Sequence, residues 1–413
     1  QSRPVVLVNA AIETISNGRI ASGVVVIENG VITAVGTDVN RPPEAEVIDC
    51  AGMTIYPGML DAGTQIGLVE VSSLPETRDA NEMGDITPHA LALTAVNPNG
   101  VAIPVTRTSG VTTALTSPTG GLLPGTGALI YLDGYTPAAM DAGARTLHIN
   151  FPGIAPRGWR DRRNRKKRER EFAKRLRTLD DVFDQAVVFS GIVGERDPQD
   201  VMNEGTTYEN TAPLAAMLPA LNGRIPVVIE VNAAEDIDSA IAWIERRGLP
   251  RVILSGVREG WRVADRIAVS GLPCIVGPVL ATPTRASDGY DRPYANPGLL
   301  HAAGVKLAIR SGQSVNARNL PFNAGFAAAW GLGRQSALRA VTLDAAEIFG
   351  IDGRCGSIEV GKEATLFVAD GDPFEPATQL SRLFIRGRAI PLESRHTDLY
   401  DEFLRRGAPA ATE

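Results

Sequence analysis

The chain has 413 residues, of which 44% are hydrophobic and 21% charged, a composition typical of a folded globular protein. Its length exceeds that of one ordinary domain of about 100–150 residues and suits one large domain plus a smaller one. The 41 basic and 47 acidic residues give a net charge of −6, which disfavours a nucleic-acid binder, and no apolar run reaches the roughly 20 residues of a membrane-spanning helix.

The first 56 residues read as short strands separated by turns. Val- and Ile-rich runs alternate with the dipeptides Asn17-Gly18 and Asn29-Gly30. Asn-Gly is the dipeptide that best supports a tight hairpin turn, because both of its residues tolerate a positive φ. We therefore expect an antiparallel β module at this end of the chain.

From residue 57 to 350 the pattern changes to short apolar runs that alternate with helix-like stretches. The run IPVVIEVNA precedes the helical AEDIDSAIAWIERRG, and PRVILSG precedes the helical EGWRVADRIAVSG. Such alternation is typical of parallel strands joined by crossover helices. The length, and the lack of a Gly-x-Gly-x-x-Gly motif after an early strand, favour an α/β fold of the (β/α)8 TIM-barrel type.

After residue 350 the β pattern returns in CGSIEVGKEATLFVAD and SRLFIRGRAIPL. We expect residues 1–56 and 351–413 to form one composite β-sandwich domain beside the barrel of residues 57–350. The chain begins at Gln1, as a processed protein does after removal of an export signal, so a periplasmic or secreted location is the expectation, with a cytoplasmic one as the alternative.

A strongly basic segment spans residues 157–177 and has twelve Arg or Lys residues against three acidic ones. One interpretation is a surface that binds a partner through Arg162, Arg163, Lys166 and Lys167. The other is a solvated basic helix in a loop of the barrel. The segment has no row of aromatic residues for base stacking, so we do not expect it to bind nucleic acid.

Four stretches carry a family pattern: IYPGMLDAGTQIGL, IPVVIEVNAAEDI, GVKLAIRSGQSVNARNLPFNAGFAAAWGL with the following ALRAVTLDAAEIFGI, and GSIEVGKEATLFVADGDPF. Together they resemble the imidazolonepropionase-like members of the amidohydrolase superfamily over nearly the whole chain. In active relatives the first stretch contains His-x-His. The resemblance implies that these imidazoles, further His residues and an Asp at strand eight bind metal, which activates a water for hydrolysis.

The sequence departs from that pattern at each metal-binding position. Gly63 and Gln65 stand where His-x-His belongs, and Glu230 stands at the end of strand five. Arg258 lies in the strand-six region, and Gln313 follows strand eight where the family has its Asp. We expect these to be vestigial positions, with no catalytic residue and no bound metal. A Glu230–Arg258 ion pair is one hypothesis for what fills the vacated site.

No other cofactor site is evident. Cys50, Cys274 and Cys355 lie far apart and form no Cys-x-x-Cys pair, so neither a zinc ribbon nor a redox motif is expected. Even without a metal, side chains at the carboxyl ends of the barrel strands reach the mouth of the expected barrel. Of these, His148, Ser255 and Ser311 are candidates for lining a small-molecule pocket there.

We therefore expect a pseudoenzyme: an amidohydrolase-like structural or regulatory subunit without metal, in a homo-oligomer or in a hetero-oligomer with an active relative. One alternative is a hydrolase of non-peptide carbon–nitrogen bonds that works without metal or with substitute ligands such as Glu230 and His148. The other alternative is a module that binds a small ligand in the barrel mouth.

Overall fold

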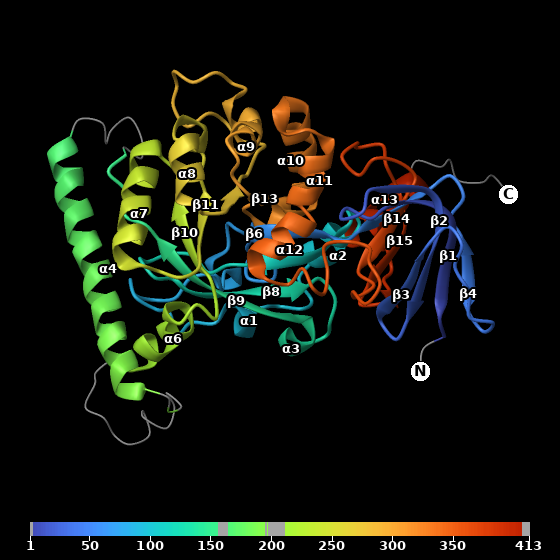
Figure 1. Ribbon diagram of the computed structural model, residues 1–413, viewed down its shortest axis with the longest axis horizontal. Coiled ribbons are helices and arrows are strands. Elements are labelled where there is room, and N and C mark those ends of the chain that lie inside the picture. The colour runs from blue at the N-terminus through green and yellow to red at the C-terminus, as the bar shows by residue number, and fades with distance from the viewer. Residues whose placement is uncertain (1–2, 156–163, 195, 197–210, 407–413) are drawn as a thin grey trace.

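The structure is a computed structural model that describes residues 3–155, 164–194, 196 and 211–406. Two eight-stranded sheets organise it, one built from both ends of the chain and one from the middle. Figure 1 shows the blue strands of the amino-terminal part beside the red strands of the carboxyl-terminal part, at one end of a longer body covered by helices. The α/β fold with a barrel and a separate β domain is confirmed.

The first sheet has the strand order β16-β15-β14-β5-β1-β2-β3, and β4 pairs with β1. Its strands are β1 (Val5–Glu13), β2 (Arg19–Glu28), β3 (Val31–Gly36), β4 (Glu46–Asp49), β5 (Thr54–Pro57), β14 (Leu366–Ala369), β15 (Leu380–Ile385) and β16 (Arg388–Ala389). Both Asn-Gly dipeptides join paired antiparallel strands, as predicted. At the second dipeptide, Asn29 (φ 50°) and Gly30 (φ 87°) adopt the left-handed conformation that such a turn requires.

The second sheet runs in the order β13-β12-β11-β10-β9-β8-β7-β6. Its strands are β6 (Met59–Thr64), β7 (Val111–Thr116), β8 (Gly125–Tyr131), β9 (Asp141–Asn150), β10 (Val227–Val231), β11 (Val252–Gly256), β12 (Cys274–Val276) and β13 (Leu307–Ile309). The sheet curves so that its two edge strands, β13 and β6, meet. At this seam the N–H of Gly312 donates to the carbonyl of Gly63 at 2.9 Å. The sheet therefore forms a nearly closed barrel.

One strand of the barrel departs from the predicted parallel arrangement. β8 pairs antiparallel with both β7 and β9. It follows the short connection at residues 117–124, where Gly120 (φ 82°) and Gly121 (φ 58°) help to reverse the chain within a few residues. A turn this short leaves no room for a crossover helix, so the next strand returns antiparallel.

Helices cover the outside of the barrel. They are α1 (Ala92–Ala95), α2 (Ala102–Arg107), α3 (Pro137–Met140), α4 (Arg165–Val193), α6 (Thr211–Leu221), α7 (Ala234–Arg247), α8 (Ala264–Ser270), α9 (Arg292–Ala302), α10 (Leu320–Ala327), α11 (Arg334–Ala340), α12 (Leu343–Phe349) and α13 (Arg395–Arg406), with short turns η1 (Pro75–Thr77), η3 (Gly260–Arg262), η4 (Ser314–Asn319) and η5 (Ala328–Leu332). None of the helices that the structure describes is both long and apolar enough to span a bilayer.

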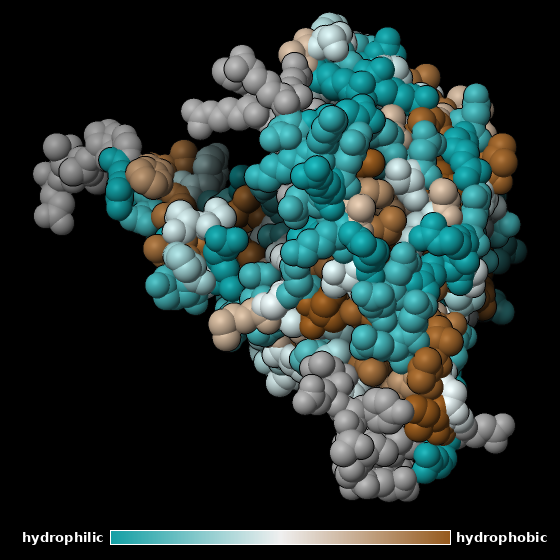
Figure 2. All heavy atoms as spheres, turned by 90° about the vertical axis from the view of Figure 1, so that its left-hand side faces the viewer, coloured by the Kyte–Doolittle hydropathy of each residue, from teal (hydrophilic) through white to brown (hydrophobic). Residues whose placement is uncertain are grey.

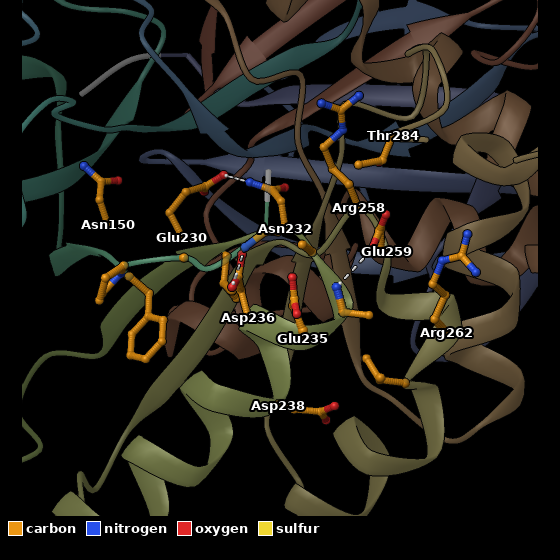
Figure 3. A pocket seen from close by; sticks show the side chains of 18 of the residues that line it. Asn150, Glu230, Asn232, Glu235, Asp236, Asp238, Arg258, Glu259, Arg262 and Thr284 are labelled. Atoms are coloured by element: carbon orange, nitrogen blue, oxygen red, sulfur yellow. Dashed lines mark hydrogen bonds between the residues drawn. The ribbon is translucent and has the colours of Figure 1, made fainter. Parts of the chain in front are cut away.

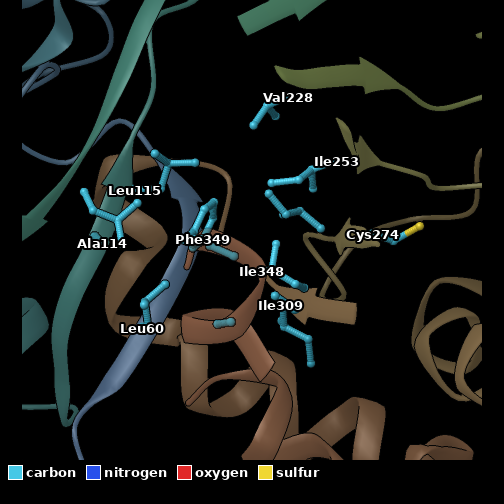
Figure 4. Close-up of a cluster of buried hydrophobic side chains, with 14 of the residues drawn as sticks. Leu60, Ala114, Leu115, Val228, Ile253, Cys274, Ile309, Ile348 and Phe349 are labelled. Carbon is cyan, nitrogen blue, oxygen red and sulfur yellow. The ribbon is translucent and has the colours of Figure 1, made fainter. Parts of the chain in front are cut away.

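The barrel core is mostly aliphatic. Figure 4 shows part of it, in which Ile348 and Phe349 of α12 lie against the strands that carry Leu60 and Ile309. α7 illustrates how a helix docks on this core. It has acidic residues in its first turn, Arg246 and Arg247 in its last, and one buried apolar face.

The basic segment is helical where it is described. α4 begins at Arg165, and Arg162 and Arg163 lie outside the described residues. Lys166 and Lys167 are exposed, whereas the buried face of the helix comes from its second half. Figure 2 looks at the side of the molecule that carries α4 and shows a mostly hydrophilic surface. Lys166 and Lys167 are therefore at the surface of the isolated chain, and partner binding through this segment stays a prediction.

Candidate functional site

A polar cleft of about 1530 Å³ lies at the carboxyl ends of barrel strands β9 to β12. This is the end of a (β/α)8 barrel where binding and catalytic residues gather. Asn150 is the last residue of β9, Asn232 follows β10, and Arg258 and Glu259 follow β11. Figure 3 shows these side chains around the cleft, with Asn232 hydrogen-bonded to Glu230.

The floor of the cleft is an ion pair between Glu230 and Arg310. Nη1 of Arg310 donates to Oε2 of Glu230 at 2.7 Å, and Nη2 donates to Oε1 at 2.8 Å. The guanidinium also donates from Nη1 to the hydroxyl of Ser255 at 2.8 Å and from Nε to the carbonyl of Gly277 at 3.1 Å. A planar guanidinium that grips both carboxylate oxygens in this way is a strong, oriented contact.

Gly63 makes room for this pair. A Cβ atom added at Gly63 would lie 3.1 Å from Cδ of Arg310, closer than ordinary van der Waals contact. The stem of Arg310 therefore passes through the space next to the backbone of β6 that a larger residue would occupy. The Arg310 side chain can therefore point into the barrel because Gly63 has no side chain.

Charge and burial set the protonation states around the pair. Burial raises the pKa of Glu230, but the Arg310 charge and hydrogen bonds from Arg310, Asn232 and Ser255 outweigh it and hold that pKa at about 2. Burial lowers the pKa of His148 to about 4, with Glu230 opposing and Arg310 adding to the effect. At neutral pH the floor therefore holds a charged Glu230–Arg310 pair above a neutral imidazole.

A second buried carboxyl group lies where β6 meets β13. Oδ1 of Asp61 accepts the N–H groups of Ser311 at 3.0 Å and of Gly63 at 3.1 Å. Burial raises the pKa of Asp61 to about 6, although these hydrogen bonds and the charge of Arg310 work in the opposite direction. Asp61 therefore fastens the seam of the barrel, and its protonation changes in the weakly acidic range.

The hypothesis of a Glu230–Arg258 ion pair is wrong. Glu230 pairs with Arg310, and Arg258 instead donates to the carbonyl of Thr282 at 3.0 Å from the cleft wall. Both arginines follow barrel strands, but Arg310 comes directly after β13 with its side chain inside the barrel, whereas Arg258 lies beyond the end of β11.

The other predicted site residues fall into two groups. Gln65 is half-buried just beyond β6, and Gln313 is exposed, with its Oε1 accepting from the side chain of Asn316. Three buried residues lie beneath the cleft, and none of them is among the residues that line it: His148, whose Nε2 bonds the hydroxyl of Thr146 at 2.8 Å, Ser255 under Arg310, and Ser311 beside Asp61.

The residues at this end of the barrel do not fit the metal centre that the family resemblance implies. Gly63 has no side chain, and both oxygens of Glu230 are bound by a cation. In the part of the chain that the structure describes, no three His, Cys, Asp or Glu side chains come together as a metal-binding group. A fixed guanidinium among the strand ends also repels a second cation.

Sequence reasoning missed Arg310, although the sequence contains a signal for it. The stretch VKLAIRSG places one arginine at the end of an apolar run that precedes Ser311 and Gly312. A charged residue that follows a buried strand needs a partner of opposite charge, because an unpaired buried charge is very costly. The sequence does not show which face of the strand the Arg310 side chain occupies.

Comparisons with known proteins agree with the architecture. Residues 298–390 match the family model described as Amidohydrolase family. Amidohydrolase tasK from Hapsidospora irregularis is 23% identical over 400 residues; the match covers 89% of this chain and 40% of that protein, so the chain spans less than half of its length.

Solved structures extend the comparison to nearly the whole chain. The crystal structure of an amidohydrolase from Thermotoga maritima MSB8 is 25% identical with a TM-score of 0.80, covering 94% of this chain and 99% of that one. Molinate hydrolase (16% identity, TM-score 0.59, 100% and 99% covered) and a prolidase complexed with N-methylphosphonate-L-proline (17%, 0.57, 94% and 99%) share the fold. The family match and the Thermotoga maritima structure show similarity to amidohydrolases, and the more distant structures show the same fold.

Proposed function

We propose that this amidohydrolase-superfamily chain is a pseudoenzyme of the imidazolonepropionase-like type, in which an internal salt bridge has replaced the metal centre. The observation that carries the proposal is the Arg310 guanidinium, held by Glu230 and packed against Gly63. It supplies a permanent positive charge at the strand ends, where relatives hold a metal cation. It has no open coordination position and generates no hydroxide nucleophile.

The substitute-ligand hydrolase is less well supported by the geometry. Its two proposed ligands, Glu230 and His148, are both engaged by protein partners, the first by Arg310 and the second by Thr146. Metal binding would require breaking a buried ion pair, which typically costs about 3–5 kcal/mol. The role that remains is a structural or regulatory subunit, associating with itself or with a catalytically intact relative.

Metal content and hydrolysis test the proposal together. The chain is purified after expression with added zinc, its metal content is measured by elemental analysis, and its mass is measured by gel filtration with light scattering. We expect far less than one metal ion per chain and no hydrolysis of amide, lactam or carbamate substrates. One tightly held zinc per chain, with hydrolysis that a chelator abolishes, would show that the chain is a metal-dependent enzyme.

A second candidate function, small-ligand binding, is favoured by the cleft itself. The Glu230–Arg310 ion pair closes only the floor of the cleft. The cleft itself, of about 1530 Å³, stays open and is lined by polar side chains. Clefts of this kind, with a few convergent polar groups, are where small ligands bind. A regulatory subunit with such a cleft has a place to sense a metabolite.

A further inference from the structure

The first half of α4 concentrates positive charge in a chain that is acidic elsewhere. Residues 165–177 contain eight Arg or Lys residues and two acidic ones, Glu169 and Glu171, which gives this half a net charge of +6. The whole chain carries −6, so the remaining residues together carry −12. Figure 1 shows α4 at the outer edge of the barrel, at the opposite end of the molecule from the β domain. The first half of α4 is therefore a basic region at the edge of an otherwise acidic molecule.

Three of the eight basic side chains have partners within the chain. Arg165 pairs with Glu169 at 2.8 Å, Arg175 lies 3.7 Å from Asp85, and Nε of Arg168 donates to a backbone carbonyl at 2.7 Å. The other five, which we call the basic face of α4, are exposed and form no ion pair with any carboxylate that the structure describes: Lys166, Lys167, Arg170, Lys174 and Arg177.

The basic face occupies one side of the helix. Steps of three or four residues separate Lys166, Arg170, Lys174 and Arg177, and such steps bring helical side chains to the same side. The side that packs on the barrel, which includes Leu179, lies opposite, because the two sets are about half a turn apart at roughly 3.6 residues per turn. With a rise of about 1.5 Å per residue, the basic face is about 17 Å long.

This placement of charge is unfavourable for the helix itself. The positive end of the helix macrodipole lies at the amino terminus, and the first turn of α4 has no acidic residue but contains Arg165, Lys166 and Lys167. Like charges four residues apart, as in Lys166–Arg170 and Arg170–Lys174, also repel each other. Residues that oppose the stability of their own helix without an internal partner are typical of functional surfaces. An anion from outside the chain would remove the conflict.

The surroundings of the basic face distinguish among anionic partners. The large apolar side chains of this half of the helix, Phe172 and Leu176, are turned toward the barrel, so the five cations have no apolar side chain among them. Protein interfaces are centred on buried aromatic or apolar anchors, and nucleic-acid sites add side chains that stack on or read the bases. An anionic lipid surface requires neither, and roughly four to eight clustered Lys or Arg residues are typical of the segments that bind it.

We propose that the basic face of α4 binds the surface of an anionic lipid membrane, with the helix lying along the headgroups. The ammonium and guanidinium groups contact the phosphate and carboxylate groups of the lipids, and no side chain of this face enters the hydrocarbon. Because the rest of the chain is acidic, the same membrane repels the other surfaces and holds the molecule with α4 toward the lipid. Membrane binding goes beyond the pseudoenzyme assignment and does not depend on it.

Flotation of the full chain with lipid vesicles tests the proposal. Vesicles of phosphatidylcholine alone are compared with vesicles that also contain phosphatidylserine, at about 0.1 M and about 1 M salt, between which the Debye length falls from about 10 Å to about 3 Å. Two double variants each remove two positive charges from α4. One is Arg170→Gln with Lys174→Gln on the basic face, and the control is Arg165→Gln with Arg175→Gln, whose native guanidinium groups already have carboxylate partners.

Thermal melts without vesicles verify that each variant folds. The basic-face variant should melt no lower than the wild type, because removing charges that repel each other favours the amino-terminal half of the helix. A loss of vesicle binding by this variant is then a loss of contact with lipid and not of structure.

We expect the wild type to bind the phosphatidylserine vesicles at about 0.1 M salt, to release them at about 1 M, and not to bind phosphatidylcholine alone. The basic-face variant should bind about tenfold or more weakly, and the control less than about threefold more weakly. No binding to the anionic vesicles, equal binding to both kinds of vesicle, or equal losses in the two double variants would overturn the proposal. Tighter binding to poly-L-glutamate or to duplex DNA at the same salt would also overturn it. Metal content of the same preparations reports separately on the pseudoenzyme proposal.

Discussion

The Glu230–Arg310 pair gives the sharpest prediction about stability. Replacing Arg310 by Met keeps most of the side-chain volume but leaves the Glu230 carboxylate without its cation. The drop in the pKa of Glu230 from 4.5 to about 2 corresponds to about 3 kcal/mol of net stabilisation of the ionised form. This agrees with the cost of about 3–5 kcal/mol for breaking a buried pair. The Glu230 side chain is 31% exposed, so we expect the lower end of that range.

The assay is urea denaturation of four proteins at pH 7: wild type, Arg310→Met, Glu230→Met and the double variant. Each single variant should lose about 3 kcal/mol of unfolding free energy. The double variant should lose much less than the sum, because an apolar pair of similar volume often replaces a buried ion pair at little cost. Arg258→Met is the matched control and should change stability by no more than about 0.5 kcal/mol.

The pH of the measurement follows from the sign of the pKa change. Because folding lowers the pKa of Glu230, its stabilising contribution is complete above pH 4.5 and is lost as the pH falls toward 2. A coupling energy below about 0.5 kcal/mol at pH 7 would refute the reasoning. It would mean that the two side chains do not act as one unit at the barrel floor.

Two further substitutions test the surroundings of the pair. Folding raises the pKa of Asp61 from 3.8 to about 6, so ionisation of Asp61 destabilises the fold as the pH rises through this range. Asp61→Asn should therefore gain about 2 kcal/mol relative to the wild type between pH 4 and 7, and an equal difference at both pH values would contradict this. Gly63→His should cost about 1–3 kcal/mol, because its Cβ would crowd Arg310, and should not create a zinc site in metal-binding titrations; stoichiometric zinc in this variant would show that Arg310 moves aside readily.

Local rules predicted the elements of the fold well. The Asn17-Gly18 and Asn29-Gly30 turns join antiparallel strands as expected, because the chemistry of a tight turn depends on two adjacent residues. The alternation of apolar runs and helical stretches indicated a barrel. The antiparallel β8 was not predicted, because the apolar pattern of a buried strand is the same in either direction.

The candidate site was predicted in part. Reading the strand ends identified Gly63 in place of an imidazole and Glu230 as a lone carboxylate, since both follow from residue type at a motif position. The partner of Glu230 was assigned to Arg258 instead of Arg310. The two arginines are equally plausible along the chain, and only the direction in which each side chain leaves its strand separates them.

Residue chemistry along the chain was enough to predict the loss of the histidine-based metal centre of active relatives, because Gly63 and Gln65 stand where the resemblance places imidazoles. Only the tertiary structure decided which side chains meet at that end of the barrel. Glu230 and Arg310 are 80 residues apart, and the closure of the barrel brings them together. Their pairing arises because a buried guanidinium and a buried carboxylate are each unstable alone, and sequence order does not record which charges share one enclosed space.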